Sequence, residues 1–299
     1  MVFGLIELYR MIKVKIFLLK SFGVNETGGN PAGVVLSAEN LTDGQKKAIS
    51  KEVNFSETAF IEASDKADFK VRFFTPTEEV DLCGHATIAT YSLLFQRSLL
   101  KSGSYKQELK AGVLGIEVQD DGLVIMEQSL PQFSESIPLE VITDVFDKSI
   151  IVDGLTPQIV STGLRDIMLP VQTREQLFSF KPDFGKMADM NKKTNSIGVH
   201  AFTLDTIDPK SIAHCRNFAP LYGITEESAT GSSNGALACY LYHHGKLNDR
   251  SLHDMKFEQG YSMNKPSEIF VGLEVDGQQI IKVTVGGRAI LFGEKEIEI

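Results

Sequence analysis

Short apolar runs broken by turn residues dominate this chain and predict a strand-rich protein. The runs with strand character in the first part of the chain are residues 12–22, 34–36, 56–61 and 69–74, followed by strands at about 105–130. A turn over Gly28–Gly33 separates the first two runs. The second part predicts strands near 157–172 and 195–206, and a hairpin-like segment over 282–292.

Longer patterns predict helices between these strands. Thr42, with a glutamine three residues later, shows the capping-box spacing and predicts a helix over 42–51. Apolar runs predict two buried helices, one over 86–100 and one over 232–244, the second ended by Gly245. A further helix is expected near residues 173–179.

Two stretches about half a chain apart resemble each other and predict an internal duplication. Arg72–Thr87 and Arg216–Ser232 both open with Arg-x-Phe-x-Pro and then carry an acidic pair. Each reaches a glycine, Gly84 or Gly231, that precedes an apolar helical run. We interpret the repeat as two similar domains that direct two loop-to-helix turns at one shared cleft.

Such a turn suits an anionic ligand. A helix N-terminus leaves backbone N–H groups unpaired and carries a partial positive charge. Glycine lets the backbone approach a ligand closely. Two such ends, at Gly84 and Gly231, would bind a small anion, most simply a carboxylate. The alternative is that both are ordinary helix caps.

Length and hydrophobic content favour two domains with separate cores. The chain has 299 residues, of which 42% are hydrophobic. We predict a first domain of residues 11–130 plus 281–299 and a second of residues 131–280, because Leu130-Pro131 marks a crossing and a strand from the C-terminus is expected to return to the first domain. Residues 1–10 are interpreted as an extension.

The charges and cysteines exclude several classes of function. With 30 basic against 39 acidic residues and no Lys/Arg cluster, nucleic acid is not an expected partner. Residues 1–11 are apolar, but too short and too interrupted by charge to span a membrane. Cys83, Cys215 and Cys239 show no disulfide framework and fit a cytoplasmic protein. The six histidines include no His-x-x-x-His pair, so no metal site is predicted.

Several short motifs occur in a fixed order along the chain: Gly29-Asn-Pro-Ala-Gly-Val34, Phe55-Ser-Glu-Thr-Ala-Phe60, Phe74-Thr-Pro76, Gly84-His-Ala-Thr87, Arg216-x-Phe-Ala-Pro220, Ala229-Thr-Gly-Ser232, Gln259-Gly260 and Lys265-Pro-Ser267. The ordered set resembles one known family, the phenazine-biosynthesis PhzF-like isomerases, over about Lys13 to Ile299.

The resemblance implies an α+β, diaminopimelate-epimerase-like fold. In that fold two pseudo-twofold-related domains each wrap a curved, mostly antiparallel sheet around a central helix, and the active site lies between them. The best-studied members isomerise a dihydro-hydroxyanthranilate without a cofactor, and the family usually forms homodimers. The expected partner is therefore a small carboxylic acid, with no cofactor.

The resemblance also implies roles for particular residues. The acid/base glutamate of the family falls on Glu57, its histidine on His85, and its acidic residue before the second glycine on Glu227. The predicted substrate-binding residues are Asn30, Gly84, Thr230, Gly231 and Ser232.

Two departures from the family pattern concern the site. The usual Asp-Pro is Glu227-Ser228, so the longer carboxylate must sit differently. The glycine of the family's G-R-P-S is Asn264, which tolerates positive φ, and Lys265 replaces its arginine.

The residues themselves support a proton carrier at Glu57. It lies among apolar neighbours, where desolvation would raise its pKa toward neutrality. The competing interpretation is an epimerase or racemase using Cys83 as a second base, although the partner position holds Thr230, which is no base at neutral pH. A non-catalytic ligand-binding protein with the same fold is the third possibility.

Overall fold

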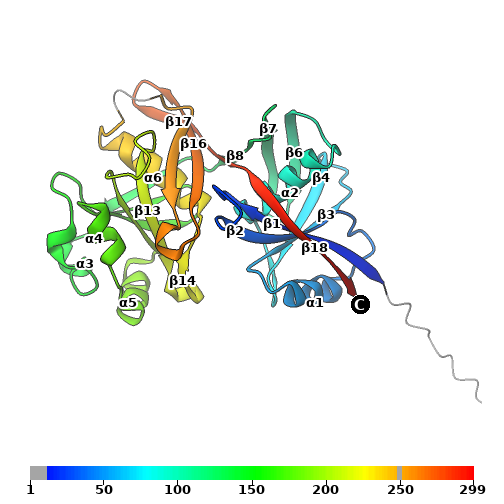
Figure 1. Ribbon diagram of the computed structural model, residues 1–299. Helices are drawn as coiled ribbons and strands as arrows, with labels where there is room; N and C mark the ends of the chain where they lie inside the picture. Colours follow the sequence, from blue (N-terminus) through cyan, green and yellow to red (C-terminus); the bar gives the residue numbers. More distant parts are fainter. Residues whose placement is uncertain (1–11, 248–250) are drawn as a thin grey trace, which may run out of the picture.

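The computed structural model describes residues 12–247 and 251–299, which form two lobes joined along their facing sides (Figure 1). The first lobe contains β1 (Lys13–Ser21), β2 (Asn30–Val35), α1 (Asp43–Val53), β3 (Thr58–Glu62), β4 (Phe69–Phe74), β5 (Glu79–Val80), α2 (Gly84–Gln96), β6 (Gly103–Leu109), β7 (Gly112–Val118), β8 (Val124–Gln128) and β18 (Ala289–Glu298).

The second lobe contains β9 (Gln132–Ser136), α3 (Leu139–Ile142), η1 (Lys148–Ile150), β10 (Gln158–Ser161), β11 (Arg165–Pro170), α4 (Arg174–Ser179), α5 (Phe184–Thr194), β12 (Gly198–Thr203), β13 (Ala213–Ala219), η2 (Pro220–Tyr222), β14 (Ile224–Glu227), α6 (Gly231–His243), β15 (Met255–Gln259), η3 (Tyr261–Met263), β16 (Ser267–Asp276) and β17 (Gln279–Gly287).

The two lobes repeat one topology. In the first, β1–β2 and β3–β4 are antiparallel, whereas β2–β3 and β4–β6 are parallel. In the second, β10–β11 and β12–β13 are antiparallel, whereas β11–β12 and β13–β15 are parallel. The chain is thus an α+β protein with two pseudo-twofold-related halves, as the duplicated motif predicts.

Each lobe wraps its strands around one central helix. Nine residues of α2 and nine of α6 are buried, because neighbouring strands cover most sides of each helix. The largest hydrophobic cluster includes residues from both helices, while smaller clusters pack beneath α1 and beneath α4 and α5.

The chain crosses between the lobes twice, and the crossings mirror each other. After β8, the next strand β9 pairs with β10 of the second lobe. After β17, the next strand β18 pairs with β1 of the first lobe. The strands that precede the crossings, β8 and β17, pair antiparallel with each other. The predicted boundary at residue 280 falls inside β17, and the domain division stays a prediction.

Most predicted elements are confirmed. The strand over 12–22 is β1, and the helix over 42–51 is α1 with both bonds of its capping box. Gly245, just past α6, has φ 65°, as a residue that ends a helix requires. The strand returning from the C-terminus is β18.

Other predictions were wrong in detail. The buried helices begin at the glycines themselves, so they cover 84–96 and 231–243 and not 86–100 and 232–244. The predicted turn over Gly28–Gly33 already belongs to β2 from Asn30 onward. The 11-residue helix α5 was not predicted.

The segment over 282–292 is not a hairpin. Its two parts belong to β17 and β18, which pair with strands in different lobes. The Gly286-Gly287 pair makes no turn. It permits close packing, because a side chain at Gly287 would lie 2.3 Å from the ring of Phe22. The predicted extension over residues 1–10 lies outside the described residues.

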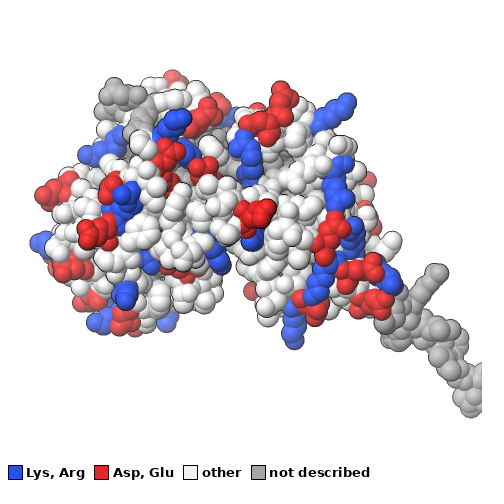
Figure 2. Space-filling view, viewed as in Figure 1, with Lys and Arg blue, Asp and Glu red and all other residues white. Residues whose placement is uncertain are grey.

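Acidic and basic side chains are interspersed on the face shown in Figure 2. Within residues 12–247 and 251–299, no helix combines the length and apolar character needed to cross a membrane.

The repeated arginine and acidic residue form the same device in both lobes. Arg72 donates from Nε and one terminal nitrogen to Glu79, at 2.8 and 2.7 Å. Arg216 holds Glu226 in the same forked manner, at 2.9 and 2.8 Å. Each guanidinium also lies over a phenylalanine two residues on, at 5.0 and 4.9 Å from the ring centre. The pairs tie the loop before each central helix to its sheet.

Arg216→Ala should lower the free energy of unfolding by about 3–5 kcal/mol, because it leaves the Glu226 carboxylate partly buried without its partner. The guanidinium also donates to the backbone carbonyls of Leu177 and Phe180. Urea titration measures the loss, and Lys13→Ala, which removes an exposed ion pair, is the control. Equal small effects of both variants would contradict this role for Arg216.

Candidate active site

The N-termini of α2 and α6 are the first components of the site. Their N-cap residues are Cys83 and Thr230, and neither side chain makes a capping hydrogen bond. The helix ends therefore lack the side-chain bond of an ordinary cap, and their first N–H groups are available to an anion.

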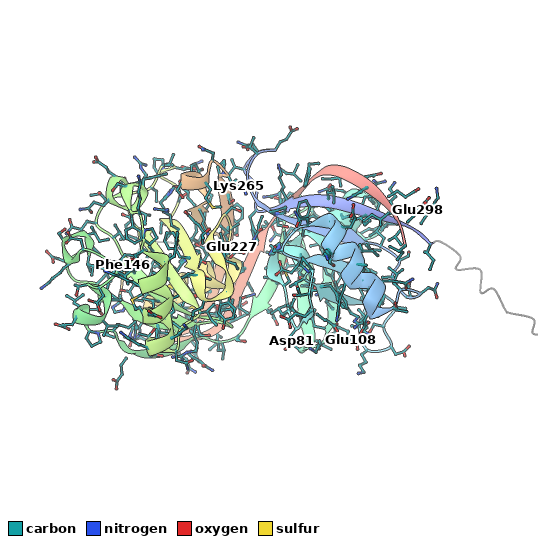
Figure 3. The ribbon with its side chains drawn as sticks, turned by 90° about the horizontal axis from the view of Figure 1, so that it is seen from below. Asp81, Glu108, Phe146, Glu227, Lys265 and Glu298 are labelled. Carbon is teal, nitrogen blue, oxygen red and sulfur yellow. The ribbon has the colours of Figure 1, made fainter. Side chains whose placement is uncertain are left out.

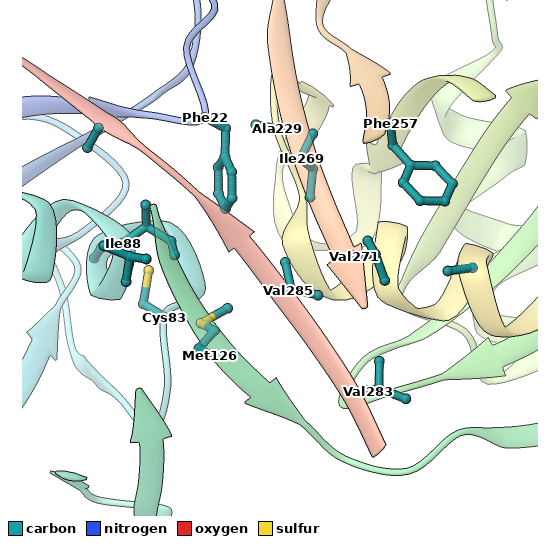
Figure 4. Close-up of a cluster of buried hydrophobic side chains, with 14 of the residues drawn as sticks. Phe22, Cys83, Ile88, Met126, Ala229, Phe257, Ile269, Val271, Val283 and Val285 are labelled. Carbon is teal, nitrogen blue, oxygen red and sulfur yellow. The ribbon is translucent and has the colours of Figure 1, made fainter. Parts of the chain in front are cut away.

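Both helices begin against the central strand pair. Met126 of β8 and Val285 of β17 are partners in register. A side chain at Gly84 would lie 2.7 Å from Met126, and one at Gly231 would lie 3.0 Å from Val285. Figure 4 shows Met126 and Val285 on adjoining strands, with Cys83 to one side. Glycine at both positions thus brings the helix ends close to the junction of the lobes.

The first lobe supplies a cluster of three reactive groups. Nε2 of His85 lies 3.3 Å from Oε2 of Glu57. Nδ1 of the same ring lies 3.5 Å from Sγ of Cys83. Glu57 comes from the turn just before β3, whereas Cys83 and His85 come from the start of α2. The structure therefore brings together three residues that the sequence singled out separately.

Two serine hydroxyls lie next to His85. Its backbone carbonyl accepts a hydrogen bond of 2.6 Å from Ser21 Oγ at the end of β1. Ser56 Oγ lies 3.4 Å from Nε2. The His85 side chain is 9% exposed and that of Glu57 is 20% exposed, so both are largely shielded from solvent.

Glu57 has a free acceptor. Among the described residues, its Oε2 atom is buried and receives no hydrogen bond of good geometry. A buried oxygen without a donor costs free energy, which is a reason to look for a functional role. A substrate C–H, N–H or O–H group could contact it.

The second lobe contributes Glu227, which reaches across to the first lobe. Its two carboxylate oxygens accept hydrogen bonds from Asn30 Nδ2 at 2.8 Å and from Thr230 Oγ1 at 2.6 Å. Figure 3 shows Glu227 on the side of the second lobe that faces the first. The structure therefore joins three more predicted site residues in one cross-lobe contact.

The two residues that replace the expected Asp-Pro both contact the first lobe. Glu227, in place of aspartate, reaches Asn30. Ser228, in place of proline, donates from Oγ to the Gly29 carbonyl at 2.9 Å. The longer acid and the new hydroxyl thus hold the segment that precedes β2. Asn264, in place of glycine, has φ 55°, a positive value that asparagine was expected to tolerate.

The electrostatics of the cluster are set by burial and by the opposed acids. Burial raises the pKa of Glu227; His85 acts in the opposite direction, and Glu57 raises it further. Burial raises the pKa of the Cys83 thiol well above its ordinary value, and the Glu57 and Glu227 carboxylates add to the shift. Cys83 is therefore a protonated thiol at neutral pH and a poor base.

Ser232 is the least engaged of the predicted residues. It is half-buried, and its backbone carbonyl accepts a hydrogen bond of 3.0 Å from Thr162. Its hydroxyl makes none of the hydrogen bonds found within the described residues. It lies one residue past Gly231, in the first turn of α6, where a ligand at the helix end would meet it.

Gln259 was missed as a functional residue. Its Oε1 accepts from the Thr230 backbone N–H at 3.1 Å, and its Nε2 donates to the Glu227 carbonyl at 2.8 Å. Gln259-Gly260 belongs to the family motifs, but no spacing in the sequence shows that the glutamine holds the loop carrying Glu227.

The sequence predicts no metal site, yet three possible ligands meet here. Donor atoms of Glu57, Cys83 and His85 all lie within 4.8 Å of one another. Carboxylate, thiolate and imidazole are donors that zinc accepts, so these residues could hold such an ion once the thiol has lost its proton. Sequence spacing could not show this set, because Glu57 comes from a different element.

Comparisons with known proteins agree with this geometry. The family model described as Phenazine biosynthesis-like protein (PhzC-PhzF) matches residues 19–295. An uncharacterized isomerase of Clostridium acetobutylicum is 34% identical, over 95% of this chain and 98% of its own. A trans-2,3-dihydro-3-hydroxyanthranilate isomerase of Pseudomonas fluorescens is 26% identical, over 94% and 98%.

Solved structures show the same fold. A phenazine biosynthesis protein of the PhzF family from Bacillus anthracis superposes with a TM-score of 0.88 at 29% identity, covering 97% of this chain and 100% of the other. A hydroxyproline epimerase from Agrobacterium vitis, at 12% identity and a TM-score of 0.62 over 96% and 93%, shares the fold alone. The chain therefore belongs to the phenazine biosynthesis-like (PhzC-PhzF) family of isomerases, with an epimerase-like fold.

Proposed function

We propose that this protein is a cofactor-independent isomerase in which Glu57 moves a proton on a small cyclic or amino carboxylic acid. The observation that carries the proposal is the Glu57 carboxylate: its buried Oε2 receives no hydrogen bond of good geometry from the described residues and lies 3.3 Å from Nε2 of His85. A proton carrier must reach the substrate with a free oxygen, and this carboxylate offers one.

The rest of the site suits a carboxylic acid. The uncapped starts of α2 and α6 supply backbone N–H groups and partial positive charge for its carboxylate. His85, beside the base, would donate to or accept from a neighbouring hydroxyl or amino group. Glu227, held by Asn30 and Thr230, would orient a polar group on the opposite side.

The reaction proposed conserves all atoms. Glu57 takes a proton from a carbon next to a C=C double bond, and the electron pair of that C–H bond forms a new double bond to the neighbouring carbon. The π pair of the original double bond then takes the proton back from Glu57 at its far carbon, so one C–H bond and one C=C bond are broken and one of each is formed. The Pseudomonas fluorescens relative is named for trans-2,3-dihydro-3-hydroxyanthranilate, which makes that compound the first to test. We also propose that the protein forms a homodimer, because members of the family usually do.

Glu57→Gln should lower kcat by about 10²–10⁴-fold, because the amide keeps the shape of the side chain but cannot carry a proton. NMR in deuterium oxide follows the exchange of substrate hydrogen for deuterium. Glu78→Gln is the control: it changes an exposed glutamate that precedes α2, and it should exchange at the parental rate. Parental exchange by the Glu57 variant would assign the base elsewhere.

Glu227→Gln should raise KM more than it lowers kcat, because Glu227 is proposed to orient the substrate. The amide keeps only one acceptor oxygen, so the variant also loses one of the two hydrogen bonds from Asn30 and Thr230. Steady-state kinetics with the dihydro-hydroxyanthranilate give both constants. A loss of kcat as large as that of Glu57→Gln, with KM unchanged, would show that the base lies in the second lobe.

Cys83→Ala and Cys83→Ser should keep kcat within about tenfold of the parent. The thiol is protonated at neutral pH, and the matching position in the second lobe is Thr230. The buried Cys239→Ala variant controls for packing. If both Cys83 variants fold but lose all exchange, the epimerase-type mechanism with a thiol base replaces the one proposed.

A further inference from the structure

A layer of buried polar side chains lies beneath the N-terminal turn of α6. It consists of Asp166, His200, Asn217, Ser233, Asn234 and Gln259. All are at most 3% exposed, and they come from five different elements. Such a layer is costly to bury, so its arrangement needs a reason.

One half of the layer anchors the helix. Ser233, in the first turn of α6, donates from its hydroxyl to Asp166 on β11. Asn217 on β13 donates one amide hydrogen bond of 3.1 Å to Ser233 and another of 3.1 Å to Nδ1 of His200. Burial lowers the pKa of His200 to about 3, so the ring is neutral and its Nδ1 can accept.

The other half holds the loop that carries Glu227. The Asn234 side chain donates 2.9 and 2.8 Å hydrogen bonds to the Thr230 carbonyl and to Gln259. Gln259 in turn bonds the Thr230 N–H, the Thr230 hydroxyl and the Glu227 carbonyl. These side chains therefore hydrogen-bond the backbone at Glu227 and at Thr230, the two ends of the loop that leads into α6.

The pseudo-twofold symmetry supplies an internal control. We align the two lobes by matching Arg72 with Arg216 and Gly84 with Gly231. The strand registers then place four first-lobe residues at the positions of Asp166, His200, Asn217 and Ser233; in that order, they are Ala32, Ala59, Phe73 and Ala86. These four residues are fully buried and apolar. Leu109 matches Gln259 in the same way. The fold therefore forms without polar groups at these positions.

We propose that this layer positions the 227–230 loop and the first turn of α6 for the substrate, with Asp166 as its anchor. The proposal rests on the isomerase function above. It explains why five of the six positions are polar in the lobe that holds Glu227 and apolar in the lobe that holds Glu57. The sixth, Asn234, matches Thr87, whose hydroxyl likewise donates to the carbonyl of its N-cap residue. Asp166 is a positioning residue, because it acts through Ser233 and touches no reacting atom.

The test replaces the anchor by the residues that the first lobe uses. The Asp166→Ala/Ser233→Ala double variant should fold with an unchanged or higher Tm, since an apolar replacement of a buried polar pair is often neutral or stabilising. Its backbone amides over residues 224–234 should exchange hydrogen for deuterium at least about tenfold faster, measured by mass spectrometry. Anthranilate, used as a carboxylate probe, should bind about 10-fold more weakly by calorimetry, and kcat should fall about 10–100-fold.

Two controls separate positioning from stability. Asp166→Asn keeps an oxygen that can accept from Ser233, so this single variant should keep the amide protection that the double variant loses. Asn191→Ala removes a buried hydrogen bond of 2.7 Å to Ser196 in the same lobe, away from the site. It should lower Tm without changing exchange over 224–234.

A lower Tm in the double variant with parental amide exchange and parental anthranilate affinity would overturn the proposal and leave a structural role. If the double variant does not fold, His200→Ala, which copies Ala59, gives the same readouts with the same expected direction. Amide exchange needs no turnover, so failure of Glu57 as the base would leave this test intact.

Discussion

The antiparallel pairing of β8 with β17 is the constraint on which the rest of the molecule depends. It joins the two lobes at Met126 and Val285, and each central helix begins against one of these side chains. Because both helix ends need a glycine to approach the pair, the site forms where the pseudo-twofold axis passes. The two chain crossings that follow β8 and β17 then lock each lobe to the other through β9 and β18.

The duplication provides a symmetric frame, and the two acids of the candidate site break that symmetry. The strand registers place Gly198 of the second lobe where the first has Glu57, and a side chain at Gly198 would lie 2.2 Å from a backbone oxygen of β13. Conversely, Val80 matches Glu227 by its spacing from the helix glycine. Each lobe thus contributes one acid, and neither acid has a counterpart by symmetry. The forked arginine pairs, in contrast, are kept in both lobes because both loops must be held.

Burial then tunes the groups that meet at the junction. The thiol of Cys83 stays protonated because it is buried beside two carboxylates, although it occupies the position that a thiol base would take. Burial also raises the pKa of Glu227, while hydrogen bonds from Asn30 and Thr230 stabilise its charged form.

The sequence by itself determined the duplicated motif, the two buried helices after Gly84 and Gly231, the family and the residues Glu57, His85 and Glu227 as candidates. These depend on local patterns, in which apolar spacing, glycine and short motifs carry the information. Tertiary structure alone decided that Glu227 reaches Asn30 across the lobes, that Glu57 meets Cys83 and His85, and that Gln259 holds the second loop. It also decided that residues 282–292 cross between lobes and do not fold back as a hairpin. These contacts join residues far apart in the chain, and the free energy that selects them comes from packing and pairing between whole sheets, which no spacing along the sequence records.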